Sequence, residues 1–79
     1  MDTATERTRK LPTGWRVELL GMIDAVEFTN DDGYSLLWSD GDWHFISSTG
    51  QPMPARAVPH ASTQREARRV GTEWISEAG

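Results

Sequence analysis

Two short acidic turns that contain glycine constrain this chain more than any other feature. Asp31-Asp32-Gly33 fits a three-residue hairpin loop, in which a type I turn is followed by glycine in the left-handed region. Asp40-Gly41 is a strong two-residue hairpin signal. The segments that flank these turns are therefore predicted to be successive antiparallel strands.

The second turn also predicts which residues face each other. If Asp40-Gly41 closes the hairpin, Trp38 lies opposite Trp43 as a non-hydrogen-bonded pair, in which side chains are closest. A four-residue loop leaves the same two residues opposite each other. Alternation along the strands adds further apolar residues to this face: Val26, Phe28, Tyr34, Leu36 and Phe45. We expect the face to be the core, and the alternative is an exposed stacking platform for a sugar or nucleobase.

The opposite face of the predicted sheet is mixed in character. It carries Leu37 and Ile46 as apolar side chains on either side of His44. A single short helix covers only one side of a sheet, so this second face is either half-solvated or meets a partner. Leu37, His44 and Ile46 are therefore the predicted protein-binding residues, and a homodimer through this face is one form of that prediction.

The segment before the first turn is ambiguous. Residues 15–19 alternate apolar and charged side chains, and residues 23–29 contain Val, Phe and Thr, which is typical of strands. However, Trp15, Leu19, Met22 and Val26 also follow a helical spacing. We prefer two strands with Gly21 in a bulge or reversal between them. The alternative is a helix over residues 15–27, which gives a hairpin between two helices.

A proline-rich segment follows the predicted hairpins. Pro52, Pro54 and Pro59 interrupt regular hydrogen bonding, so residues 48–61 are predicted to be an extended crossing segment. Met53 and Val58 are its expected anchors on the core.

The end of the chain, from Ala61, is the clearest helix. Thr63 and Glu66 form a plausible capping box. An apolar face holds Ala67, Val70 and Trp74, with Ile75 and Ala78 beside them, and the opposite face holds Arg65, Arg68, Arg69 and Thr72. Gly71 either weakens the centre of this helix or lets the sheet approach closely.

These elements predict an α+β fold, in which a three- or four-stranded antiparallel meander packs against one C-terminal helix. With 79 residues the chain has room for one domain, which we place at residues 14–79 after a flexible N-terminal arm at residues 1–13. The chain lacks a long apolar segment, an apolar N-terminal stretch and cysteine, so we expect a soluble, cytoplasmic protein.

The residues that could carry chemistry are not arranged for catalysis or metal binding. The two acidic turns lie at opposite ends of one strand, roughly 15 Å apart, and neither matches a calcium loop. His44 has no organised nucleophile beside it, His60 lies in the proline-rich segment, and no phosphate-binding glycine loop is present. We expect no enzymatic activity, metal, cofactor or small-molecule substrate.

The charge distribution separates two functional hypotheses. The net charge is −4, yet residues 17–53 contain seven acidic residues and no Lys or Arg, so the sheet is unsuited to contact phosphates. The first hypothesis is a non-catalytic protein-interaction module. The alternative is a nucleic-acid-binding protein that uses the arginine face of the helix, with contributions from Arg56 and the basic arm at residues 7–10. Its candidate residues are Arg65, Arg68, Arg69 and Arg56.

Overall fold

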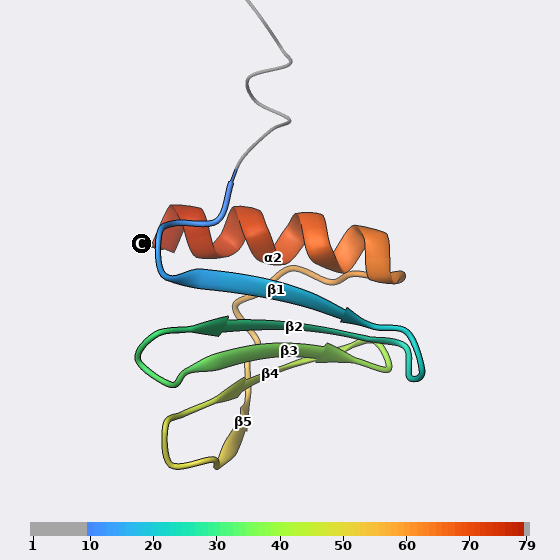
Figure 1. Cartoon of the computed structure of the whole chain (residues 1–79). Helices are drawn as coiled ribbons and strands as arrows, with labels where there is room; N and C mark the ends of the chain where they lie inside the picture. The colour runs from blue at the N-terminus through green and yellow to red at the C-terminus, as the bar shows by residue number, and fades with distance from the viewer. Residues whose placement is uncertain (1–9, 79) are drawn as a thin grey trace, which may run out of the picture.

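A five-stranded antiparallel sheet is the main element of the computed structural model, which describes residues 10–78 (Figure 1). The strands lie side by side in chain order: β1 (Trp15–Leu20), β2 (Ala25–Asn30), β3 (Ser35–Ser39), β4 (Asp42–Ile46) and β5 (Pro52–Pro54). The helix α2 (Gln64–Ala78) packs against one face. The predicted α+β class is confirmed, with five strands in place of three or four. Most of the predicted flexible arm, residues 1–9, lies outside the described residues.

Both hairpin turns form as predicted. Asp40 and Gly41 have φ values of 54° and 86°, so both occupy the left-handed region that a type I′ turn requires. Gly33 also has a positive φ, 89°. The register places Trp38 opposite Trp43 on β4 and opposite Val26 on β2. The predicted pairing of the two tryptophans is therefore confirmed.

Residues 15–27 form β1, a turn and the start of β2, so the helical alternative for this segment is wrong. Val17 lies opposite Phe28 and Leu19 opposite Val26, which aligns the apolar side chains of both strands on one face. Gly21 lies in the turn between the strands. Long-range pairing on a shared apolar face outweighs the helical propensity of Leu and Glu in this segment.

The fifth strand is the part of the fold that the proline-rich sequence obscured. The Ala55 N–H donates to the Trp43 carbonyl over 3.1 Å, so Trp43 and, by alternation, Phe45 direct their backbone groups toward β5. Phe45 pairs with Met53, and the two flanking prolines direct their nitrogens away from β4. An edge strand tolerates proline in this position because no N–H is required there.

Val58 is buried at 6% exposure and is confirmed as an anchor, whereas Met53 is 60% exposed, so the prediction for Met53 is wrong. Met53 lies on the edge strand, beyond the residues that the helix covers.

The helix begins after a cap that resembles the predicted one. Thr63 Oγ1 accepts a hydrogen bond from the Glu66 N–H over 3.1 Å. The Glu66 carboxylate accepts from the N–H of Ser62, over 2.9 Å, one residue earlier than in a standard capping box. The Gln64 side chain donates to the carbonyls of Leu20 and Ala25, which ties the start of the helix to the β1–β2 turn.

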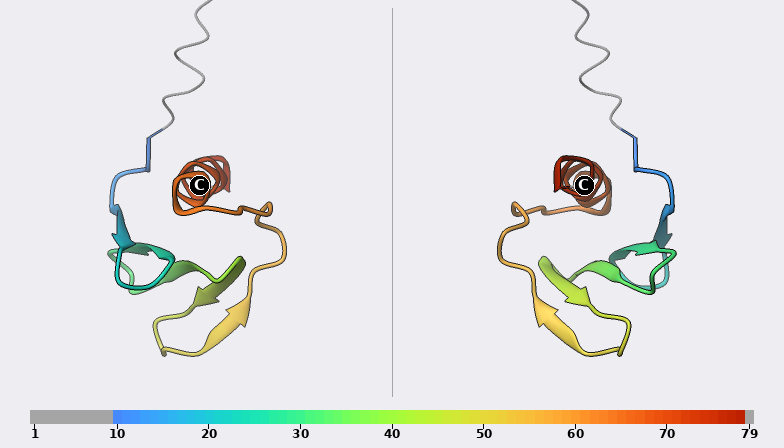
Figure 2. Two further views of the ribbon diagram at one scale, coloured as in Figure 1. Left: turned by 90° about the vertical axis from the view of Figure 1, so that its right-hand side faces the viewer. Right: turned by 90° about the vertical axis from the view of Figure 1, so that its left-hand side faces the viewer.

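The sheet curves around its apolar face, and the helix lies across the open side of that curve (Figure 2). The segment from Ala55 to Thr63 returns from β5 to the helix on one side, and residues 10–14 with β1 lie on the other. The core between these layers consists of Val26, Phe28, Leu36, Trp38, Trp43, Val58, Ala61, Ala67, Val70 and Ile75.

Candidate interaction surfaces

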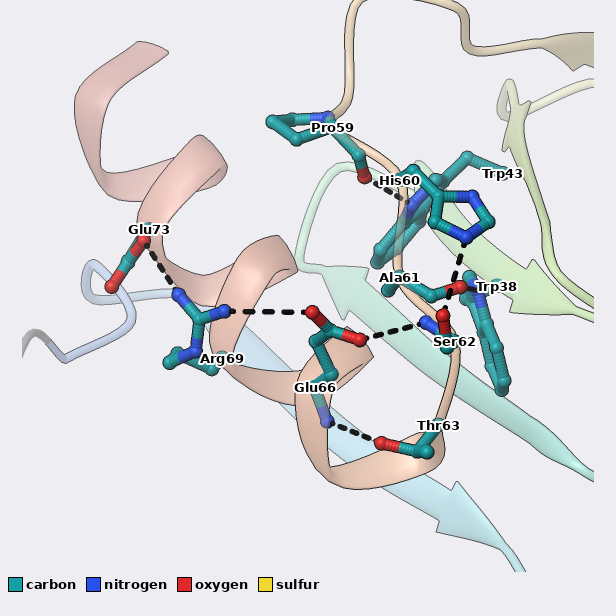
Figure 3. Close-up of polar contacts among 10 residues, drawn as sticks. All are labelled: Trp38, Trp43, Pro59, His60, Ala61, Ser62, Thr63, Glu66, Arg69 and Glu73. Atoms are coloured by element: carbon teal, nitrogen blue, oxygen red, sulfur yellow. Dashed lines mark hydrogen bonds and ion pairs between the residues drawn. The ribbon is translucent and has the colours of Figure 1, made fainter.

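Trp38 and Trp43 belong to the core and form no exposed stacking platform. Their exposed fractions are 1% and 6%. Each indole N–H donates to a carbonyl of the returning segment, Trp38 to Ala61 over 3.1 Å and Trp43 to Pro59 over 2.9 Å (Figure 3). The buried polar atom of each ring is therefore satisfied. The core prediction is confirmed, and the platform alternative is wrong.

The three predicted protein-binding residues lie together on the opposite face, as the alternation required. Leu37 is directly opposite His44, and Ile46 follows two residues later on the same strand. All three side chains are half-buried. The reason is the unpredicted edge strand, because Pro54 lies opposite His44 and Pro52 lies opposite Ile46. We call this surface the open sheet face.

The open sheet face also carries an unfavourable pair of charges. Glu18 lies directly opposite Glu27, which in turn lies opposite Leu37. Like charges in directly opposed cross-strand positions destabilise a sheet. The face therefore carries charged side chains over β1 and β2, with Arg16 beside the two glutamates, and is more apolar over β3 and β4.

Reversing one of these charges is expected to stabilise the protein. Glu18→Lys replaces the repulsion with a cross-strand attraction to Glu27, and the free energy of unfolding should rise by about 0.2–1 kcal/mol. Urea denaturation followed by circular dichroism measures the change. Asp24→Lys is the matched control, because it alters the net charge equally in an exposed turn. Equal effects of the two variants would contradict cross-strand repulsion as the cause.

A groove of about 610 Å³ lies between β1 and α2, on the side of the molecule where the chain enters the sheet. Its apolar floor is formed by Leu11, Val17 and Leu19, and Leu19 is 44% exposed. The remaining lining residues are mostly basic: Lys10, Arg65, Arg68, Arg69, Thr72 and Glu73. The predicted arginine face of the helix thus forms one wall of a groove that also exposes apolar side chains.

The cations of this groove differ in how far their charge is compensated. Arg69 lies between two carboxylates, 3.4 Å from Glu73 and 3.9 Å from Glu66 (Figure 3). Arg65 and Arg68 have no carboxylate partner among residues 10–78, and the same holds for Lys10. The groove therefore offers positive charge that the described part of the chain does not neutralise.

Arg56, the fourth predicted nucleic-acid-binding residue, lies elsewhere. It lines a second hollow of about 530 Å³ beside β4, together with His44 and His60. The structure thus brings together Arg65, Arg68 and Arg69 but not Arg56. Among the described residues, no three metal-ligating side chains gather in positions that could hold an ion.

The sequence does not reveal that β1 lines this groove. Val17 and Leu19 alternate with charged residues, and that pattern alone assigns them to the core face. Lys10 and Leu11 belong to the predicted flexible arm and carried no structural signal. The alternation of β1 could have suggested an edge strand, but the lateral position of the helix on the sheet decides whether that edge is open.

The fold and these surfaces define a small α+β domain with one basic, partly apolar groove and one open sheet face. Comparison with protein-family models, with curated proteins and with solved structures finds no match to this chain. Within residues 10–78, no helix has both the length and the apolar character needed to cross a bilayer.

Proposed function

We propose that this chain is a non-catalytic protein-interaction module that holds its partner in the groove between β1 and α2. The observation that carries the proposal is a hollow that combines the exposed side chain of Leu19 with cations that have no carboxylate partner among residues 10–78. Protein interfaces combine an apolar centre with polar and charged groups at the rim, and arginine is enriched in them. The apolar floor would supply burial, and the cations would select partners that carry carboxylates.

The groove is better supported as the primary site than the open sheet face. Leu19 in the groove is more exposed than either apolar residue of the open sheet face. Two cations of the groove wall, Arg65 and Arg68, have no carboxylate partner among residues 10–78. Self-association through Leu37, His44 and Ile46 stays a second prediction for the same molecule.

Reversal of one charge in the groove tests whether the partner binds in the groove or on the open sheet face. Arg68→Glu should weaken partner binding about ten-fold, because it places a carboxylate where the partner requires a cation. Arg56→Glu is the matched control, since it changes the charge equally at an exposed site outside the groove, and should alter binding by less than about two-fold. The measurement is quantitative capture from native-host extract, followed by calorimetry with the purified partner. Circular dichroism checks that each variant is folded.

Leu37→Asp tests the open sheet face in the same assay. Loss of capture or of self-association with this variant alone, while Arg68→Glu binds normally, would move the site to the open sheet face. Empty captures together with a monomer in light scattering would remove the basis of the proposed function.

Nucleic-acid binding is the second candidate, favoured by three cations along a single groove that lack a carboxylate partner in the described part of the chain: Lys10, Arg65 and Arg68. It predicts binding that weakens steeply as salt is added and that Arg68→Glu reduces further. The apolar floor is not required for contact with phosphates, and the net charge of −4 opposes such binding. Absence of binding to duplex and single-stranded probes at low salt would exclude it.

A further inference from the structure

The edge of the sheet at β1 is open toward the groove, and the hydrogen-bond register shows which of its residues are unpaired. The Asn30 N–H donates to the Tyr34 carbonyl over 3.0 Å, so Asn30 directs its backbone groups toward β3. In an antiparallel sheet, alternate residues of an inner strand pair with opposite neighbours. Glu27 and Thr29 therefore direct their backbone groups toward β1.

The partners of these two residues identify the free groups of β1. On β1, Glu18 pairs with Glu27 and Arg16 pairs with Thr29. The alternate residues of β1, Val17 and Leu19, therefore direct their N–H and C=O groups away from β2, to the outer edge of the sheet. No residue in the described part of the chain bonds to these outer groups. The same two residues form the apolar floor of the groove.

We propose that the groove binds an extended acidic segment of a partner protein, which pairs with the free edge of β1 as an additional strand. This inference rests on the proposed protein-interaction function and gives the chemistry of the partner. Free edge groups provide main-chain hydrogen bonds, and the adjacent groove reads the alternate side chains of the added strand.

The spacing of the cations suits such a segment. Along the helix axis, Arg65 is about 4.5 Å from Arg68 and about 6 Å from Arg69. Alternate side chains of an extended strand, which point to the same face, are about 6.6 Å apart. A carboxylate on that face can therefore reach one of the arginines, while the next side chain on the same face, about 6.6 Å further along, contacts Leu19.

Charge complementarity favours an acidic partner over a second copy of this chain. Pairing of two β1 edges around a two-fold axis would bring two basic grooves side by side, and like charges in juxtaposition disfavour association. A nucleic acid would satisfy the arginines but would leave the apolar floor and the backbone groups of Val17 and Leu19 without matching partners.

The test uses the full chain and a defined probe. The probe is a terminally blocked peptide of about nine residues that repeats the sequence Thr-Glu-Thr-Leu. In an extended strand, Glu and Leu then share one face and Thr occupies the other. The corresponding peptide with Gln in place of Glu controls for charge. Two further peptides carry backbone N-methyl groups. In the first every Thr is methylated, and in the second every Glu and Leu is methylated. Each set removes the N–H donors from only one edge of the peptide strand.

The expected result has three parts. The acidic peptide binds, and the Gln peptide binds about ten-fold more weakly, as does the acidic peptide to the Arg68→Glu variant. Saturating peptide slows amide hydrogen exchange, read by NMR, at Val17 and Leu19 but leaves the already paired amides of Arg16 and Glu18 unchanged. One N-methylated version loses binding and the other keeps it, and which one is lost reports the strand direction.

Several results would overturn the inference, and they are separable from failure of the proposed function. Equal binding of both N-methylated peptides without protection of Val17 and Leu19 would disprove strand addition, while binding that depends on Arg68 would still support the module. If no acidic peptide binds but Arg68→Glu still abolishes partner capture, the proposed acidic segment is disproved and the proposed interaction module is not. Capture that is insensitive to Arg68→Glu would remove both proposals. If a nucleic acid binds more tightly than the acidic peptide and displaces it, the ligand of the groove is a nucleic acid and the proposed acidic segment is wrong.

Discussion

Replacement of Trp38 by alanine is expected to remove a large part of the protein's stability. The indole is 1% exposed and fills the space between the sheet and the returning segment. Removal of a buried aromatic ring costs about 3–5 kcal/mol, and the Ala61 carbonyl loses its donor as well. A domain of this length has a total stability of only about 4–12 kcal/mol. Denaturant titration followed by far-ultraviolet circular dichroism measures the loss.

Two further variants calibrate this result. Trp38→Phe keeps an aromatic ring but removes the N–H, so its loss of stability should be intermediate, about 1–3 kcal/mol. Trp74→Ala removes a half-buried indole from the helix and should cost clearly less than Trp38→Ala. A Trp38→Ala protein as stable as the Trp74→Ala protein would contradict the placement of Trp38 at the centre of the core.

Alanine in place of Gly71 is expected to destabilise the protein, although alanine is the better helix former. A methyl group at this position would lie 2.4 Å from one ring atom of Phe28 and 3.0 Å from the indole of Trp43. The Phe28 ring is fully buried and cannot move into solvent. Overpacking typically costs about 1–3 kcal/mol and the overlap is severe here, so we expect it to exceed the gain of about 1 kcal/mol in helix propensity.

The chain contains a matched control for this substitution. Gly21 lies in the β1–β2 turn with no atom within 4 Å of an added methyl group, so Gly21→Ala should change the stability little. Combination of Gly71→Ala with Phe28→Leu should cost less than the sum of the single changes, because the smaller side chain makes space for the methyl group. Urea midpoints of the unchanged protein, the three single variants and the double variant provide the measurement. A stabilised Gly71→Ala protein would contradict the close approach.

The parts of the fold that local chemistry determines were predictable from the sequence. Asp40 and Gly41 have the side chains that tolerate left-handed φ, and this one turn sets the partners of Trp38 and Trp43. The cap at Thr63 was likewise readable. The fifth strand is not predictable in this way, because proline usually interrupts sheet pairing, whereas here only Met53 between the two prolines needs to bond with β4.

The groove could not be predicted because it depends on where the helix lies across the sheet. Periodicity identifies the buried face of the helix but not its lateral position. Gly71 contributes to that position, since it allows the helix backbone to approach Phe28 on β2 and Trp43 on β4. The helix packs mainly against β1 and β2, and Leu19 on β1 still stays partly uncovered. The arginines were identified correctly as a group, but their apolar neighbours come from distant parts of the chain.

The two prolines of β5 have a consequence for aggregation. A sheet with two receptive edges can recruit strand after strand, and this is how globular domains seed fibrils. Pro52 and Pro54 direct ring nitrogens without hydrogen toward the outer side of β5, so that edge offers incoming chains no donor at either residue. Growth by strand pairing is thus blocked at one end of the sheet. The free edge at β1 is therefore not matched by a second receptive edge at β5 on the same molecule.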